Sequence, residues 1–105
     1  MSGSATLNSS ILDVANSHID YVITGDFCSI LFDITLTNEI TWDNLVIASN
    51  IPIPVENQSL IFSAWKASEG VAGTIYIANG TFNAYSGTVY YTGRIYGTAI
   101  YKRKV

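Results

Sequence analysis

The stretch FCSILFDITLTN, residues 27–38, is the clearest strand in the sequence and sets the fold class. Its apolar and polar residues alternate, which is the pattern of a strand with one buried and one wetter face. Leu31 interrupts the polar face, and we expect it to meet a partner there. The predicted buried face carries Cys28, Ile30, Phe32, Ile34 and Leu36.

The residues on either side extend this strand into a sheet. Segment 18–23 is rich in β-branched and aromatic residues, and the turn residues 24–26 that follow it predict a hairpin with the strand at 27–38. Beyond that strand we expect an irregular connection over 38–43 and a second, short strand over 44–49.

Two alternating prolines follow, in IPIP at residues 51–54. Proline has no N–H to donate to a neighbouring strand, so Pro52 and Pro54 predict the end of pairing or a sheet edge. Each also holds the preceding residue, Ile51 or Ile53, in an extended conformation. We therefore predict a stiff crossover that carries the chain from one sheet to the other, with both isoleucines able to be buried.

The second half of the chain reads as further short strands. We expect strands over 60–65, 73–78, 81–86, 88–92 and 95–101, with turns at Gly87 and Gly93 and a bulge or close packing at Gly97. Asn79-Gly80, between two alternating runs, is the strongest of the hairpin signals because both central residues of a type I′ turn need positive φ. About eight strands at this spacing are typical of an all-β sandwich or barrel.

The composition of the chain indicates self-association. In 105 residues, enough for one domain, charged residues are 12%, about half of the roughly 25% in a typical soluble domain, and hydrophobic residues are 49%. We favour a surface partly covered by other copies of the chain over one covered only by Thr and Asn. Residues 1–12 are predicted to be a flexible leader and 13–105 a single β-sandwich domain.

Charge and cysteine usage restrict the partners and the compartment. The net charge of −3 argues against nucleic acid, which needs a basic face. Lys102, Arg103 and Lys104 could form a phosphate- or membrane-seeking tail, but we interpret them as a solvated end that keeps the last strand from pairing further. No apolar run approaches the ~18 residues of a membrane span. A single cysteine, Cys28, allows no intrachain disulfide and fits a reducing compartment or a particle assembled in cytoplasm.

We find no catalytic constellation in the sequence. His18 is the only histidine; it could be paired with Cys28 as a dyad or with Asp20 as a metal pair, but no third or fourth ligand type clusters near them. The eight carboxylates are scattered, several of them at predicted turns. We therefore expect no enzyme activity, no metal and no cofactor.

Aromatic residues are the better candidates for binding. Rings offer an apolar face and a polar tip, which suits both subunit interfaces and sugars, although most tyrosines of a β protein lie in strands for packing. The candidate ligand-binding residues are Trp42, Trp65 and Tyr85.

The order of these elements resembles the C-terminal head domains of phage tail-fibre, baseplate and receptor-binding proteins. Such heads have an alternating strand, an "ia-x-iP" segment, a strand, a "G-x-i-x-I-x-x-x-G-x-i-x-a" hairpin and a last strand that ends in Tyr. The corresponding residues here are 29–37, 47–52, 60–65, 73–85 and 94–101. The chain departs from the pattern after Pro52, where family members often have a Gly-aromatic-basic-Pro turn and this chain has IPVEN.

The resemblance implies a jelly-roll-like β-sandwich that forms a homotrimer at the tip of a fibre or on a baseplate. It implies adhesion to a host cell-surface saccharide or other receptor, in a virion assembled in the bacterial cytoplasm, and no catalytic residue. Two alternatives stay open: a purely structural trimerisation or capping domain of a fibre, and a free-standing carbohydrate-binding module.

Overall fold

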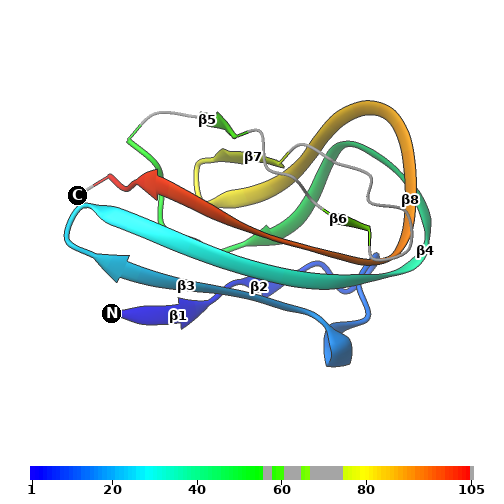
Figure 1. Cartoon of the computed structure of the whole chain (residues 1–105), viewed down its shortest axis with the longest axis horizontal. Helices are drawn as coiled ribbons and strands as arrows, with labels where there is room; N and C mark the ends of the chain where they lie inside the picture. The colour runs from blue at the N-terminus through cyan, green and yellow to red at the C-terminus, as the bar shows by residue number, and fades with distance from the viewer. Residues whose placement is uncertain (56–57, 61–64, 67–74, 105) are drawn as a thin grey trace.

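A computed structural model describes residues 1–55, 58–60, 65–66 and 75–104, and the side chains at 1–37, 45–55, 75–84 and 94–104. Its elements are nearly all strands (Figure 1). In chain order they are β1 (Ser2–Ser4), β2 (Thr6–Leu7), the 3₁₀ turn η1 (Val14–Asn16), β3 (His18–Thr24), β4 (Phe27–Ser49), β5 (Gln58–Leu60), β6 (Trp65–Lys66), β7 (Ile75–Ala78) and β8 (Thr81–Lys102).

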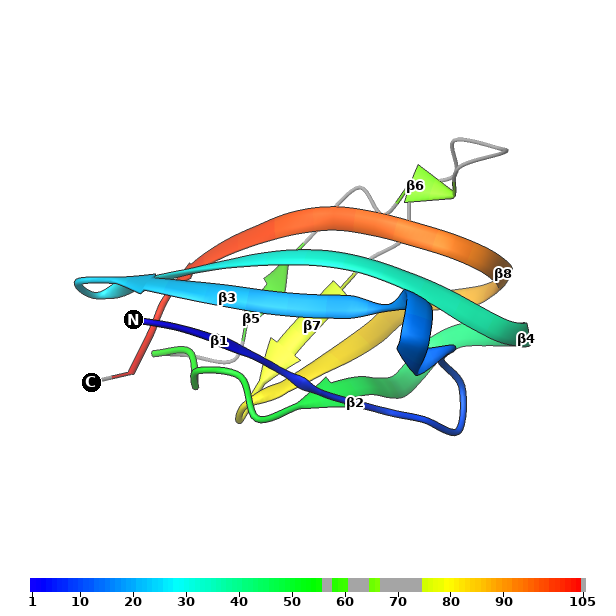
Figure 2. The same cartoon turned by 90° about the horizontal axis from the view of Figure 1, so that it is seen from below.

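Two long strands, β4 and β8, pair antiparallel and fold over together into two layers (Figure 2). The β3 layer contains β1, β3, the first half of β4, the second half of β8 and β6. The β7 layer contains β2, the second half of β4, the first half of β8, β7 and β5. The predicted antiparallel all-β sandwich of about eight strands is confirmed. It is jelly-roll-like in that one long strand pair runs through both layers.

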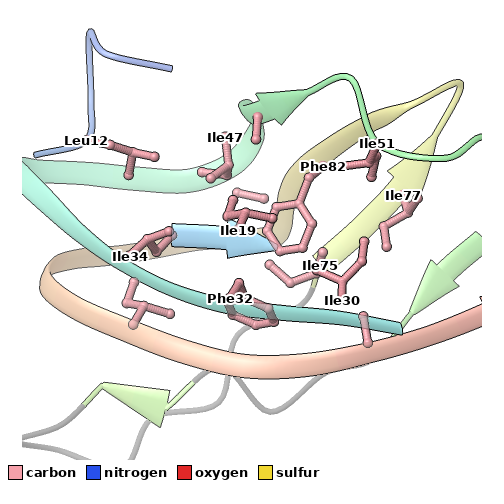
Figure 3. Packing of buried hydrophobic residues seen from close by; sticks show 14 of the residues in the cluster. Leu12, Ile19, Ile30, Phe32, Ile34, Ile47, Ile51, Ile75, Ile77 and Phe82 are labelled. Atoms are coloured by element: carbon pink, nitrogen blue, oxygen red, sulfur yellow. The ribbon is translucent and has the colours of Figure 1, made fainter. Parts of the chain in front are cut away.

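The core lies between the layers and is built by the predicted alternation. All five even-numbered apolar residues from Cys28 to Leu36 are buried, and Leu31 on the other face is exposed, both as predicted. Phe32 from one layer and Phe82 from the other meet edge to face, with ring centroids 5.1 Å apart. Isoleucines of both layers, among them Ile19, Ile47 and Ile75, surround this pair (Figure 3).

The predicted breaks in the two long strands are wrong. The 38–43 connection is part of β4, and β8 runs through Gly87 and Gly93 without a turn. The β4–β8 register instead shifts four times between Leu36 and Ala48. Extra residues on one strand of a pair bend it and increase its twist, so these irregularities fold the pair over without ending it. Gly97 pairs in register opposite Phe32, with no bulge.

Both predicted hairpin turns are confirmed. Gly25 has φ 60° in the β3–β4 turn, and Asn79 and Gly80 have φ 49° and 79° between β7 and β8. Gly80 also has a steric reason to lack a side chain, because a Cβ there would lie 3.1 Å from the carbonyl oxygen of Ile51. The predicted strand at 60–65 falls mostly outside the described residues.

The proline segment crosses between the layers as predicted. The Ile51 amide donates to Gly80 O in the β7 layer at 3.2 Å, and the Val55 amide donates to Lys102 O in the β3 layer at 3.0 Å. Pro54 is buried and forms an isolated bridge with Arg103. Ile51 is buried, but Ile53 is 48% exposed and does not join the core. We call residues 50–55 the crossover.

The boundary predicted at residue 12 is also wrong. Residues 2–4 pair with β3 and residues 6–7 with β4, so the first residues belong to the sheets. Leu12 is 2% exposed and bridges to Leu36 in the core. No strand was predicted there because residues 2–7 are mostly small and polar, and the pairing is supplied by β3 and β4.

Candidate binding surfaces

The structure brings two of the three predicted aromatic residues together along the backbone. Tyr85 on β8 pairs with Asp43 on β4, and Trp42 is the residue before Asp43. Trp65 lies on β6 in the other layer, opposite Tyr96. The side chains of Trp42, Trp65 and Tyr85 lie outside the described part of the chain, so their role as ligand contacts stays a prediction.

His18 and Cys28, the residues weighed as a catalytic dyad, are kept apart. His18 is exposed at one end of the β3–β4 hairpin, opposite Asp33, while Cys28 is buried near the other end, opposite Ile23. The described residues contain no group of three or more His, Cys, Asp or Glu side chains that could hold a metal ion. Within the same described ranges, no helix is long and apolar enough to cross a membrane.

The outer face of the β3 layer exposes an unusual number of large apolar side chains. Directly opposite residues of antiparallel strands point to the same side, so the pairing of β3, β4 and β8 gathers these side chains on one surface. Four of them are exposed by 51% to 64% and Tyr96 by 37%. We call this surface, made by Val22, Phe27, Leu31, Tyr96 and Ile100, the β3–β4–β8 face.

Charged groups of both signs surround this apolar surface. Arg94 donates from Nε and Nη2 to the two carboxylate oxygens of Asp33, each at 2.9 Å, and its guanidinium lies 4.9 Å from the centre of the Tyr96 ring. The Arg94 hydrogen bond lowers the pKa of Asp33, so that carboxylate stays ionised. Asp20 and Lys102 lie on the same face. Acidic and basic groups therefore balance on this face of an acidic chain.

Two neighbouring cavities indent the β3–β4–β8 face. One of about 350 Å³ lies over Val22, Leu31 and Ile100, and one of about 260 Å³ lies between Leu31 and Arg94. Leu31 and Thr98 line both cavities. The face is thus apolar and hollowed, with Leu31 at its centre.

A larger cavity, of about 610 Å³, lies at the end of the sandwich where both termini are drawn (Figure 1). It lies between the crossover, β3 and the residues that follow β8. We call it the crossover cavity, and its lining includes Tyr21, Ile23, Asn50, Ile53, Arg103 and Lys104. The structure thus brings two of the three C-terminal basic residues beside the proline segment.

Tyr101 holds the crossover against the β3 layer. Its ring is buried in the core, and its hydroxyl donates a short hydrogen bond to the carbonyl oxygen of Pro52. Burial raises the pKa of Tyr101 above its ordinary value, and a hydrogen bond with the Cys28 thiol adds to this. Burial likewise raises the pKa of Cys28. Both groups are therefore neutral at physiological pH and serve packing.

Sequence reasoning found part of these surfaces and missed part. The exposure of Leu31 was predicted from its place in the alternation. The crossover cavity was missed, because the basic end was interpreted as a solvated tail. The cavity depends on the pairing of Arg103 with Pro54, a contact between segments far apart in the chain that no local sequence pattern indicates.

Comparison of the chain with family models, with curated proteins and with solved structures finds no match.

Proposed function

We propose that this chain is a non-enzymatic receptor-binding head domain of the phage tail-fibre or baseplate type. In this proposal it assembles as a homotrimer in the virion and adheres to a host cell-surface saccharide or other receptor. The sequence resemblance suggests the trimer and the receptor. The observation that carries the proposal is the β3–β4–β8 face.

The apolar area of this face is of the size that an interface needs. At roughly 150–250 Å² for a large side chain, the exposed fractions of its five members leave on the order of 500 Å² of surface. A standard interface buries roughly 800 Å² per partner, of which about 60% is apolar. The face is therefore large enough to supply the apolar part of a standard-size contact, whereas a monomer would leave all of it in water.

The charges on the face favour a second copy of the chain as the partner. The whole chain carries −3, so two copies repel each other at long range. Asp20 and Asp33 are offset on the face by Arg94 and Lys102, so contact there adds no net repulsion. In a trimer, a face that turns toward the threefold axis contacts both other subunits at once, so one apolar face is enough for assembly.

The test is the solution mass of the chain, measured by light scattering on a sizing column, for the wild type and two variants. Leu31→Glu places a charge at the centre of the face, and we expect it to convert a trimer to a monomer. Val46→Glu is the matched control, because Val46 is a 43% exposed apolar residue on the other layer, and this variant should remain trimeric. Both sites are exposed in the isolated chain, so neither substitution should unfold it, and circular dichroism of both variants should match that of the wild type.

Binding of the labelled trimer to bacterial cells tests the receptor half of the proposal. A trimer that binds no cell type would favour the structural capping domain, and a monomer with sugar affinity would favour the free-standing carbohydrate-binding module. A wild-type monomer, or equal behaviour of L31E and V46E, would contradict assembly through this face.

A further inference from the structure

The crossover cavity has a charge opposite to that of the chain. Among the described residues that line it, Arg103 and Lys104 are cationic and none is acidic. The chain as a whole is acidic, so this local excess is a property of the site. We propose that the crossover cavity binds the acidic group of a saccharide, a carboxylate or a phosphate. The identity of the ligand as a receptor sugar rests on the proposed function, but the preference for an anion does not.

The walls of the cavity are fixed by backbone hydrogen bonds. Lys104 N donates to Ile53 O at 2.6 Å, and Arg103 N donates to Asp26 O at 2.7 Å. On the other side of the crossover, the Ile51 amide is held by the β7–β8 turn. The backbone amides of both cationic residues are thus hydrogen-bonded to other segments, and a preformed site loses little conformational entropy on binding.

The guanidinium of Arg103 is oriented as well as charged. Its Nε donates to Gly25 O at 3.0 Å, which restricts how the group of this cavity-lining residue can turn. Guanidinium presents a fork of N–H donors that matches a carboxylate or phosphate, whereas the exposed Lys104 supplies a mobile point charge. One oriented and one mobile cation together can bind either a planar carboxylate or a tetrahedral phosphate.

The remaining lining suits a sugar ring. Tyr21 and Ile53 offer apolar surface, and Asn50 contributes an amide whose Nδ2 donates to Thr6 Oγ1 at 2.8 Å. The volume of about 610 Å³ falls within the roughly 300–1,000 Å³ of small-molecule sites. A monosaccharide unit fits such a space with its acidic group toward Arg103 and Lys104.

The experiment is an amide NMR titration of the whole chain with three probes: glucuronic acid, glucose 6-phosphate and glucose. We expect the two anionic sugars to shift the amides at 51, 53, 103 and 104, and glucose to leave them unshifted. The shifts should weaken as sodium chloride is raised, because salt screens an exposed charge pair. Response to only one anionic sugar supports the proposal and identifies carboxylate or phosphate as the source.

Two matched variants connect the response to the cavity. Lys104→Gln should weaken binding of the anionic sugar by about fivefold, as for a partly exposed charge pair. Lys104→Arg keeps a cation at the same position and should leave the affinity within about twofold of the wild type. Glucose binding as tightly as the anionic sugars, no response to any probe, or equal effects of the two variants would overturn the proposal.

These outcomes separate this inference from the proposed function. A trimer that binds cells while its cavity ignores all three probes overturns only the anion site. A cavity that binds anionic sugars in a chain that neither trimerises nor binds cells supports the anion site and overturns the head-domain proposal.

Discussion

Removal of the Tyr101 hydroxyl is the sharpest test of how the crossover is held. Tyr101→Phe keeps the buried ring and deletes the hydrogen bond to Pro52 O, together with the contact to the Cys28 thiol. The ring is 2% exposed, so water cannot easily replace the lost donor. The crossover then depends on the backbone hydrogen bonds donated by Ile51, Val55 and Lys104, on the Asn50–Thr6 hydrogen bond and on the packing of Ile51.

The expected cost follows from the burial of the two partners. A typical hydrogen bond contributes a net ~0.5–1.5 kcal/mol, and a buried acceptor left without a donor costs ~1–3 kcal/mol. The Pro52 residue is half-buried, which places Tyr101→Phe between these ranges. We expect a loss of about 1.5 kcal/mol. At roughly 4–8 °C per kcal/mol, the melting temperature should fall by about 6–12 °C.

Urea unfolding in the Leu31→Glu background, which we expect to be monomeric, measures this loss without a contribution from altered self-association. Tyr96→Phe in the same background is the control, because its ring lies on the β3–β4–β8 face, which stays exposed in a monomer. Its free energy of unfolding should stay within about 0.5 kcal/mol of the Leu31→Glu parent. Hydrogen exchange at the Val55 amide gives a local reading and should accelerate only in Tyr101→Phe. Equal stability of the two variants, with unchanged exchange at Val55, would refute the role given to this hydrogen bond.

The other predictions concern pH, turns and ligand contacts. Folding raises the pKa values of Cys28 and Tyr101, so the folded state holds their protons more tightly than the unfolded state does. Their contribution to the free energy of unfolding should therefore be complete below the ordinary pKa values of 9.0 and 10.0 and should decrease as pH rises above them. Unfolding measured across the alkaline pH range tests this. Gly80→Ala should lower the free energy of unfolding by more than Gly25→Ala does. Both glycines have positive φ, which costs about 1–2 kcal/mol for Ala, but only Gly80 faces a backbone oxygen. Equal losses of stability in urea would contradict the steric argument. Alanine substitution of each predicted ligand contact, Trp42, Trp65 or Tyr85, should weaken cell binding while circular dichroism stays unchanged. Unaltered binding in all three variants would show that these residues do not contact the receptor.

Local sequence was a good guide wherever one residue pattern had one structural solution. Alternation over 27–36 fixes which residues face the core, since side chains of a strand point to opposite faces in turn. Asn79-Gly80 specifies its turn through backbone conformation alone. The same reasoning failed at Gly87 and Gly93, because glycine marks both a turn that ends a strand and a bend that continues it. The partner strand decides between these outcomes, and for Gly93 that partner is Leu36 on β4, more than fifty residues away.

For the candidate binding surfaces, too, one part could be predicted from local sequence and another part could not. The exposure of Leu31 follows from its own position in the alternation, so the sequence alone places it on the outer face. Its grouping with Val22 and Ile100 needs the register of three strands.

Local patterns were enough to predict the all-β class, the buried side of β4, both tight turns and the extended proline segment, because each depends on neighbouring residues and on backbone geometry. The continuity of β4 and β8, the place of the first residues in the sheets, and the position of Arg103 and Lys104 against the crossover became visible only in the folded chain. Those features depend on hydrogen bonds between segments far apart in the chain, such as Lys104 N to Ile53 O. No local pattern encodes a distant partner.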